Sequence, residues 1–132
     1  DANVLIAALL RDGHTRYLLL LSGHKFLIPE FIFEEFKKHI DELSERTGVT
    51  KEKLREILQD LLIQANITTV KIDKFEDKLH AANEITPDVD DIQYLALALK
   101  YGCPIWSNDK KLKEQKKVRI IATEELRVNP YF

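Results

Sequence analysis

The chain has 132 residues, the length of one compact domain that can bury a hydrophobic core of its own. Apolar residues make up 45% and charged residues 32%, which is the composition of a soluble globular protein and excludes a disordered or fibrous chain. The net charge of −2 excludes a uniformly basic surface, so a nucleic-acid enzyme of this composition would need local basic patches.

Cellular location and covalent cross-links are constrained by a few residues. The longest apolar run, residues 17–21, is far too short to span a bilayer, so we expect no membrane association. The single cysteine, Cys103, excludes an internal disulfide and favours a reducing, cytoplasmic compartment. The chain contains no methionine and opens abruptly at Asp1, so we expect further residues, including a first strand, to precede it.

Hydrophobic periodicity predicts helices that alternate with short strands. The predicted helices span residues 3–10, 14–22, about 29–43, a segment that Thr50 caps, 75–82, 92–101 and 110–115, with a short one after Thr123. The predicted strands span residues 25–28, 68–72, 104–107 and 118–122. Strands separated by helices predict an α/β fold, a three-layer α/β/α sandwich around a central parallel sheet of four to five short strands. We expect residues 1–132 to form this single domain.

Four acidic residues fall where these elements begin or end: Asp1, Glu35, Asp91 and Asp109. Taken one at a time, each has an ordinary explanation, because aspartate commonly caps helices and occupies turns, and an acid on a charged helix is often only solvated. Taken together they indicate a site, since functional groups in open α/β sheets gather beyond the carboxyl ends of the strands.

Four carboxylates in one pocket suit phosphodiester hydrolysis. That reaction needs an activated water and a stabilised leaving oxygen, and Mg²⁺ or Mn²⁺ ions supply both. Hard cations prefer oxygen ligands, so carboxylates build such sites, whereas the four histidines of this chain show no zinc-ligand spacing. Without a cation the carboxylates would repel one another.

Four segments, residues 1–6, 28–36, 90–98 and 104–109, resemble the four motifs of the PIN-domain family in order and spacing, and the resemblance covers essentially the whole chain. In that comparison Asp1 ends the first strand, and the second acid falls at Glu35, with Glu34 as the alternative. Asp91 heads the third motif. The fourth motif is a strand that ends in Ser107, Asn108 and Asp109. This sequence departs from the family pattern in lacking the first strand.

The resemblance implies a metal-dependent endoribonuclease with Mg²⁺ or Mn²⁺ as cofactor and RNA as substrate. It implies that Asp1, Glu35 and Asp91 hold the metal and that Asp109 completes the site or orients the attacking water. Asn3, Ser107 and Asp90 would be supporting polar groups. Many small family members are toxins of VapC-type toxin–antitoxin pairs and commonly dimerise, which implies an antitoxin partner and a homodimer.

Other features have two interpretations each. Lys110, Lys111 and Lys113 follow Asp109 and form either a phosphate-contacting rim or an ordinary solvated surface. Tyr94 and Trp106 are interpreted as core residues rather than as platforms on which bases stack, because aromatic residues at helix and strand spacing usually pack inward.

Two further functions compete with the nuclease. One is a PIN-like RNA-binding or assembly module with weak or no catalysis, against which the intact acidic set argues. The other is a phosphoacceptor receiver domain, which fits poorly because the acidic pair Asp90–Asp91 comes late in the chain.

Overall fold

The computed structural model describes residues 2–9 and 13–127. Its α-helices are α1 (Ala2–Leu9), α2 (Gly13–Leu21), α3 (Phe31–Thr47), α4 (Lys51–Gln64), α5 (Leu79–Ile85) and α6 (Ile92–Tyr101). Its strands are β1 (Phe26–Pro29), β2 (Ile67–Val70), β3 (Ile105–Trp106) and β4 (Ile120–Ile121). Short 3₁₀ turns complete the described part: η1 (Ile72–Lys74), η2 (Glu76–Lys78), η3 (Val89–Asp91), η4 (Lys111–Glu114) and η5 (Thr123–Glu125).

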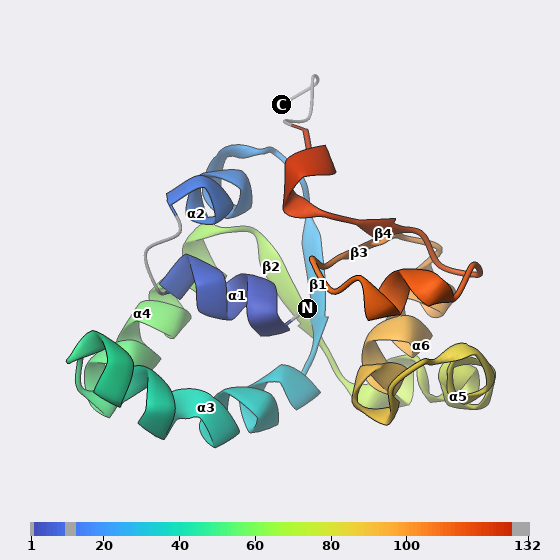
Figure 1. The fold of residues 1–132 in the computed structure, drawn as a ribbon, viewed down its shortest axis with the longest axis horizontal. Helices are drawn as coiled ribbons and strands as arrows, with labels where there is room; N and C mark the ends of the chain where they lie inside the picture. Colours follow the sequence, from blue (N-terminus) through green and yellow to red (C-terminus); the bar gives the residue numbers. More distant parts are fainter. Residues whose placement is uncertain (1, 10–12, 128–132) are drawn as a thin grey trace.

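The strands pair in parallel as two separate sheets. β1 pairs with β2, with Phe26 opposite Ile67 and Pro29 opposite Val70. β3 pairs with β4, with Ile105 opposite Ile120. Each sheet is short because its strands are short. Helices lie on both sides of β1 and β2 in Figure 1, and α6 packs against β3.

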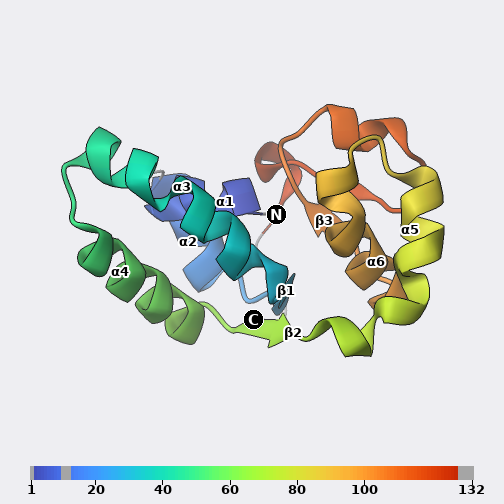
Figure 2. The same ribbon diagram turned by 90° about the horizontal axis from the view of Figure 1, so that it is seen from below.

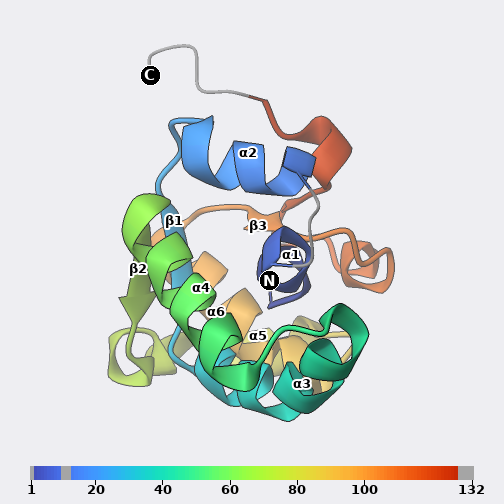
Figure 3. The same ribbon diagram turned by 90° about the vertical axis from the view of Figure 1, so that its left-hand side faces the viewer.

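Helices lie in two groups on either side of β1 and β2 (Figures 1 and 2). Helices α1, α3 and α4 contact one another in the first group, and α5 packs along α6 in the second. When the molecule is seen from the side, α3 lies below α1 and α4 runs beside it (Figure 3). One continuous core joins the two groups.

Helix α6 explains how the second group is held to the sheets. Five consecutive residues from Tyr94 to Ala98 are buried, so this helix is apolar on most of its circumference. It contacts both β1 and β3. Its C-terminus is set by Gly102 at φ +64°, a left-handed conformation that glycine adopts without a steric penalty. The element that carries Asp91 at its head is therefore fixed between the two sheets.

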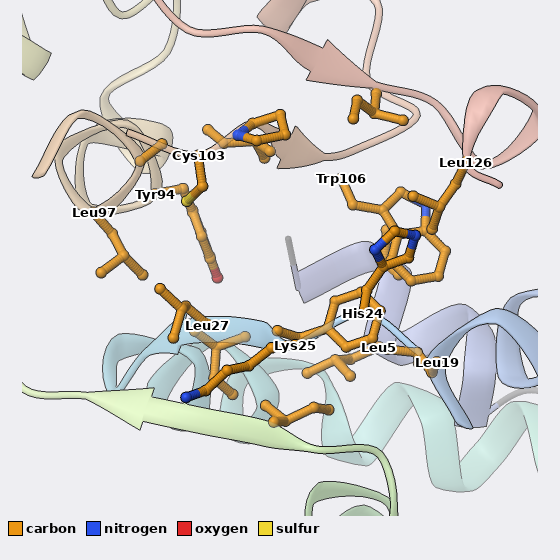
Figure 4. A pocket seen from close by; sticks show the side chains of 18 residues that line it. Leu5, Leu19, His24, Lys25, Leu27, Tyr94, Leu97, Cys103, Trp106 and Leu126 are labelled. Atoms are coloured by element: carbon orange, nitrogen blue, oxygen red, sulfur yellow. The ribbon is translucent and has the colours of Figure 1, made fainter. Parts of the chain in front are cut away.

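The prediction of an α/β fold with parallel strands is confirmed. The single central sheet of four to five strands is not formed by the described residues, because β1 and β3 do not pair with each other. An apolar cavity of about 300 Å³ separates them, and side chains from both strands and from α6, including Leu27, Leu97 and Trp106, point into it (Figure 4). The predicted strand before Asp1 lies outside the described residues.

Several element bounds differ from the predictions. The helix predicted at about 29–43 is α3 at Phe31–Thr47, because Pro29 belongs to β1, and the helix predicted at 75–82 is α5 at Leu79–Ile85. Thr50 caps α4 as expected, accepting a hydrogen bond from the Lys53 N–H at 3.2 Å. The predicted basic helix at residues 110–115 is only the 3₁₀ turn η4. The predicted cap at Thr123 is wrong, because Ala122 precedes η5 and the side chain of Glu125 accepts its N–H at 3.2 Å. Within the described ranges, no helix combines the length and the apolarity that crossing a membrane requires.

Candidate functional site

Asp91 lies at the junction between η3 and α6, and it does not cap the helix. Its side chain makes no capping hydrogen bond. The local capping role belongs to Asp88, whose Oδ1 accepts a hydrogen bond from the Asp90 N–H at 3.0 Å. Because Asp88 satisfies the turn, the ordinary explanation of Asp91 as an N-cap is excluded, and its carboxylate is available for another role.

The surroundings of Asp91 oppose its negative charge. Burial is the largest cause that raises the pKa of this carboxyl, from 3.8 to about 6. Nearby carboxylates raise the pKa further, in decreasing order Asp88, Asp109, Glu35 and Asp90. Two of the other predicted acids, Glu35 on α3 and Asp109 in the loop after β3, are thus close enough to Asp91 to oppose its charge. Perturbed carboxyls of this kind cluster at functional sites.

Glu35, one turn into α3, is positioned by Tyr94. The Tyr94 hydroxyl donates a hydrogen bond to Glu35 Oε1 at 2.6 Å. Burial and this hydrogen bond raise the pKa of Tyr94 well above its ordinary value, so the phenol stays protonated and always donates. The backbone of Ala2 also hydrogen-bonds to Tyr94, which links α1 to the same point. Glu34 is exposed, and its Oε1 lies 3.9 Å from Lys37 Nζ. The geometry therefore favours Glu35 over Glu34 as the acid that faces the cluster.

Replacing Tyr94 with phenylalanine is expected to weaken Mn²⁺ binding about tenfold, because the carboxylate of Glu35 would lose the donor that fixes its orientation. The affinity can be measured by titration calorimetry. Tyr101→Phe, at the exposed end of the same helix, is the matched control and should leave the affinity unchanged. Equal affinities in the wild type and in Tyr94→Phe would show that the hydrogen bond does not position the site.

Asp109 follows β3 and is held by its own loop. Its N–H donates to Ser107 Oγ at 3.1 Å, and its Oδ1 accepts the Lys111 N–H at 3.0 Å. Asn108 anchors the loop to η5, accepting the Thr123 N–H at 2.8 Å. The turn role predicted as the ordinary alternative is therefore real, but it occupies only one oxygen of Asp109. Ser107 is fully buried and supports the loop.

The remaining predicted residues occupy varied positions. Asp1 lies outside the described residues. Asn3, on α1, and Asp90, in η3, are exposed. Lys110 and Lys111 are exposed beside Asp109, whereas Lys113 is half-buried and pairs with Glu125, its Nζ lying 3.0 Å from Oε1. Of the three lysines of the predicted basic rim, Lys110 and Lys111 form no ion pair with another described residue, whereas Lys113 does.

The two aromatic residues that were interpreted as core residues do pack inward. Trp106 is half-buried, its ring centroid lies 5.6 Å from that of Phe26, and its Nε1 donates to Thr123 Oγ1 at 2.9 Å. Tyr94 is buried, with its ring in the apolar cavity of Figure 4. Sequence reasoning missed the second task of Tyr94. The signal was available, because a buried tyrosine hydroxyl nearly always needs a hydrogen-bond partner.

A closed metal cage is not present in the described part of the chain. Among residues 2–9 and 13–127, no three acidic, histidine or cysteine side chains converge closely enough to hold an ion. Glu35 is held by its hydrogen bond from Tyr94, and Asp109 accepts one from the Lys111 N–H. The donor chemistry nevertheless fits Mg²⁺ or Mn²⁺, because such ions need only one or two carboxylates and keep several waters.

Comparison with known proteins identifies one match. A family model described as a PIN domain matches residues 1–128. The matched range contains the four predicted acids Asp1, Glu35, Asp91 and Asp109. No curated protein and no solved structure matches the chain.

Proposed function

The chain belongs to the PIN-domain family, and from this premise we propose that it is a metal-dependent endoribonuclease that hydrolyses RNA phosphodiester bonds. PIN domains are commonly nucleases and typically use divalent metal ions. The observation that carries the proposal is the position of Asp91, where burial first and then the surrounding carboxylates raise the pKa to about 6. Such repulsion destabilises the fold unless a cation offsets it, so a bound divalent ion explains why the acids are kept together.

In the proposed reaction, the side chains of this chain would hold the cation, orient the attacking water and exchange protons. A divalent cation bound among the acids would activate water and stabilise charge on the leaving oxygen. Glu35, fixed by Tyr94, and Asp91 would hold the cation together with Asp1. Asp109 keeps one carboxylate oxygen outside its loop hydrogen bond, and that oxygen would orient the attacking water. Burial of Asp91 strengthens each of these interactions by lowering the local dielectric.

Positive charge for the RNA backbone would come from the loop after Asp109. Lys110 and Lys111 are exposed there, and neither pairs with a carboxylate of the described residues. They would contact phosphates and so position the strand without reading its sequence. Lys113 would contribute only after its ion pair with Glu125 opens.

The chemistry of the cut ends tests this proposal. A water nucleophile leaves an uncyclised phosphate at the cut, whereas attack by the ribose 2′-hydroxyl leaves a 2′,3′-cyclic phosphate. We expect uncyclised ends when a labelled single-stranded RNA is incubated with the protein and Mn²⁺. We also expect a single 2′-deoxy substitution at the cut to be tolerated. Cyclic phosphate ends would contradict the mechanism.

A catalytically weak RNA-binding or assembly module is the alternative function. The observation that favours it is the absence of a closed metal cage among the described residues. Tight RNA binding without turnover in saturating Mn²⁺ would support the module and exclude the nuclease. The toxin role in a VapBC-type pair, the antitoxin partner, the homodimer and the cytoplasmic location stay predictions.

We also propose that the two sheets are parts of one central parallel sheet of four to five strands. Support comes from the apolar cavity between β1 and β3, which has side chains from both strands in its wall (Figure 4). Each sheet has two strands within the described part of the chain, so β1 and β3 each have one edge that does not face their partner strand. An unpaired edge of this kind is a template for another strand. An extended apolar segment in the cavity would pair with both.

A further inference from the structure

A second cleft opens beside the acidic cluster. It has a volume of about 480 Å³, within the range of about 300–1,000 Å³ typical of ligand-binding clefts. Its walls come from the start of α3, from η1 and α5, and from the segment that runs from η3 into α6. Helices α5 and α6, which supply much of the lining, lie side by side in Figure 2. Nothing in the proposed hydrolysis uses this cleft.

The lining combines an aromatic ring with two unused carboxamides. Phe31 lies at the start of α3 and is only half-buried. Asn83 on α5 is exposed and Gln93 on α6 is half-buried, and neither amide hydrogen-bonds to another described residue. A carboxamide offers donors and an acceptor together, so it can pair with the edge of a nucleobase. The ring of Phe31 offers a surface on which a base can stack.

The negative charges at the cleft favour a neutral base over a phosphate as its ligand. Asp90 and His80 line the cleft, and the imidazole Nε2 of His80 lies 3.1 Å from the carboxylate Oε1 of Glu84. These carboxylates would repel a phosphate. A neutral, planar base with polar edges avoids that repulsion and uses the exposed apolar surface of Val89, which is 71% exposed.

Two connections link the lining of the cleft to the acidic cluster. Asp90 lines the cleft, and the next residue, Asp91, belongs to the cluster. The ring centroid of Phe31 lies 6.4 Å from that of Tyr94, which holds Glu35. We propose that the cleft binds one unstacked nucleobase of single-stranded RNA, in a nucleotide next to the phosphate that is cut at Asp91. This inference rests on the proposed nuclease function.

The experiment compares a single-stranded RNA with a series in which one nucleotide at a time is abasic. For the wild type in Mn²⁺, we expect an abasic site at one position near the cut to lower kcat/KM about tenfold. In the double variant Asn83→Ala/Gln93→Ala that penalty should fall to about twofold or less, because the groups that recognise the base are gone. Gln64→Ala, an exposed amide on α4, is the matched control and should keep the full penalty.

A binding measurement separates failure of the cleft from failure of the nuclease. Binding of the same RNAs to Asp91→Asn and to Asp91→Asn/Asn83→Ala/Gln93→Ala is measured by fluorescence anisotropy. This measurement does not require either variant to cleave RNA. A tenfold abasic penalty in the first and none in the second supports the cleft even if the wild type cuts no RNA. Equal binding and equal cleavage of the intact and abasic RNAs would overturn the inference while leaving the nuclease intact. Unchanged circular dichroism shows that the substituted proteins are folded.

Discussion

Replacing Asp91 with asparagine is expected to reduce RNA cleavage by at least about a hundredfold, because it removes a preorganised charge at the centre of the site. Asparagine keeps the size and one oxygen of the side chain, and the carboxylate of Asp91 makes no capping hydrogen bond that would be lost. The loss should therefore appear in kcat/KM without unfolding. Initial rates with labelled RNA in Mn²⁺ measure it.

The same substitution is expected to stabilise the fold in the presence of chelator. The pKa of Asp91 is about 6 when folded and 3.8 ordinarily, so the unfolded chain gives up this proton first as the pH rises. Stability therefore falls between about pH 4 and pH 6, and the deficit persists above that window. Asparagine removes the deficit. After allowance for solvent screening at a half-buried group, we expect a gain of about 1–2 kcal/mol in the free energy of unfolding at pH 7.

Urea unfolding in chelator at pH 4 and pH 7 measures this gain. The difference between Asp91→Asn and the wild type should be present at pH 7 and absent at pH 4. The control is Asp60→Asn, an exposed acid on α4, which should leave the free energy of unfolding nearly unchanged at both values. If Asp91→Asn were less stable than the wild type at pH 7, the negative charge of Asp91 would not destabilise the folded state, and the inference from its surroundings would be wrong.

Sequence patterns predicted the elements that depend on local periodicity. Helix α6 was expected at residues 92–101 and is found at Ile92–Tyr101, because its apolar run ends at a glycine that can adopt positive φ. The placement of Asp91 at its head followed from that. The ordinary alternative, that Asp91 caps the helix, could not be rejected from sequence, since Asp88 three residues earlier offers the same chemistry.

Contacts between distant residues were beyond the sequence patterns. The bond from Tyr94 to Glu35 joins residues 59 apart, and periodicity assigned Tyr94 only to the core. The ion pair between Lys113 and Glu125 likewise depends on how the loop after β3 packs against η5. The two separate sheets also differ from the predicted single sheet, because pairing partners are set by tertiary packing and strands this short carry little pattern of their own.

Removal of the divalent ion should abolish cleavage. Lowering the pH should reduce cleavage as well, because it weakens binding of the ion. If Asp91 is a ligand of the proposed cation, protons and the cation compete for its carboxylate, whose pKa is about 6, and the group has to lose its proton before it can bind the ion. At limiting Mn²⁺ we expect kcat/KM to fall about tenfold per pH unit below about pH 6 and to level off above it. Excess chelator at pH 7 should remove cleavage completely, and Mn²⁺ in excess of the chelator should restore it.

The dependence on ion concentration distinguishes this competition from simple deprotonation of the attacking water. If proton and cation compete for one carboxylate, the midpoint of the pH profile should stay near pH 6 while Mn²⁺ is limiting. Once Mn²⁺ exceeds its dissociation constant, each further tenfold increase should move the midpoint down by about one unit. Deprotonation of water would leave the midpoint fixed once the ion is bound. Circular dichroism across the same range checks that the fold persists. A midpoint that does not move with Mn²⁺, or cleavage that survives in excess chelator, would remove Asp91 from the role of metal ligand.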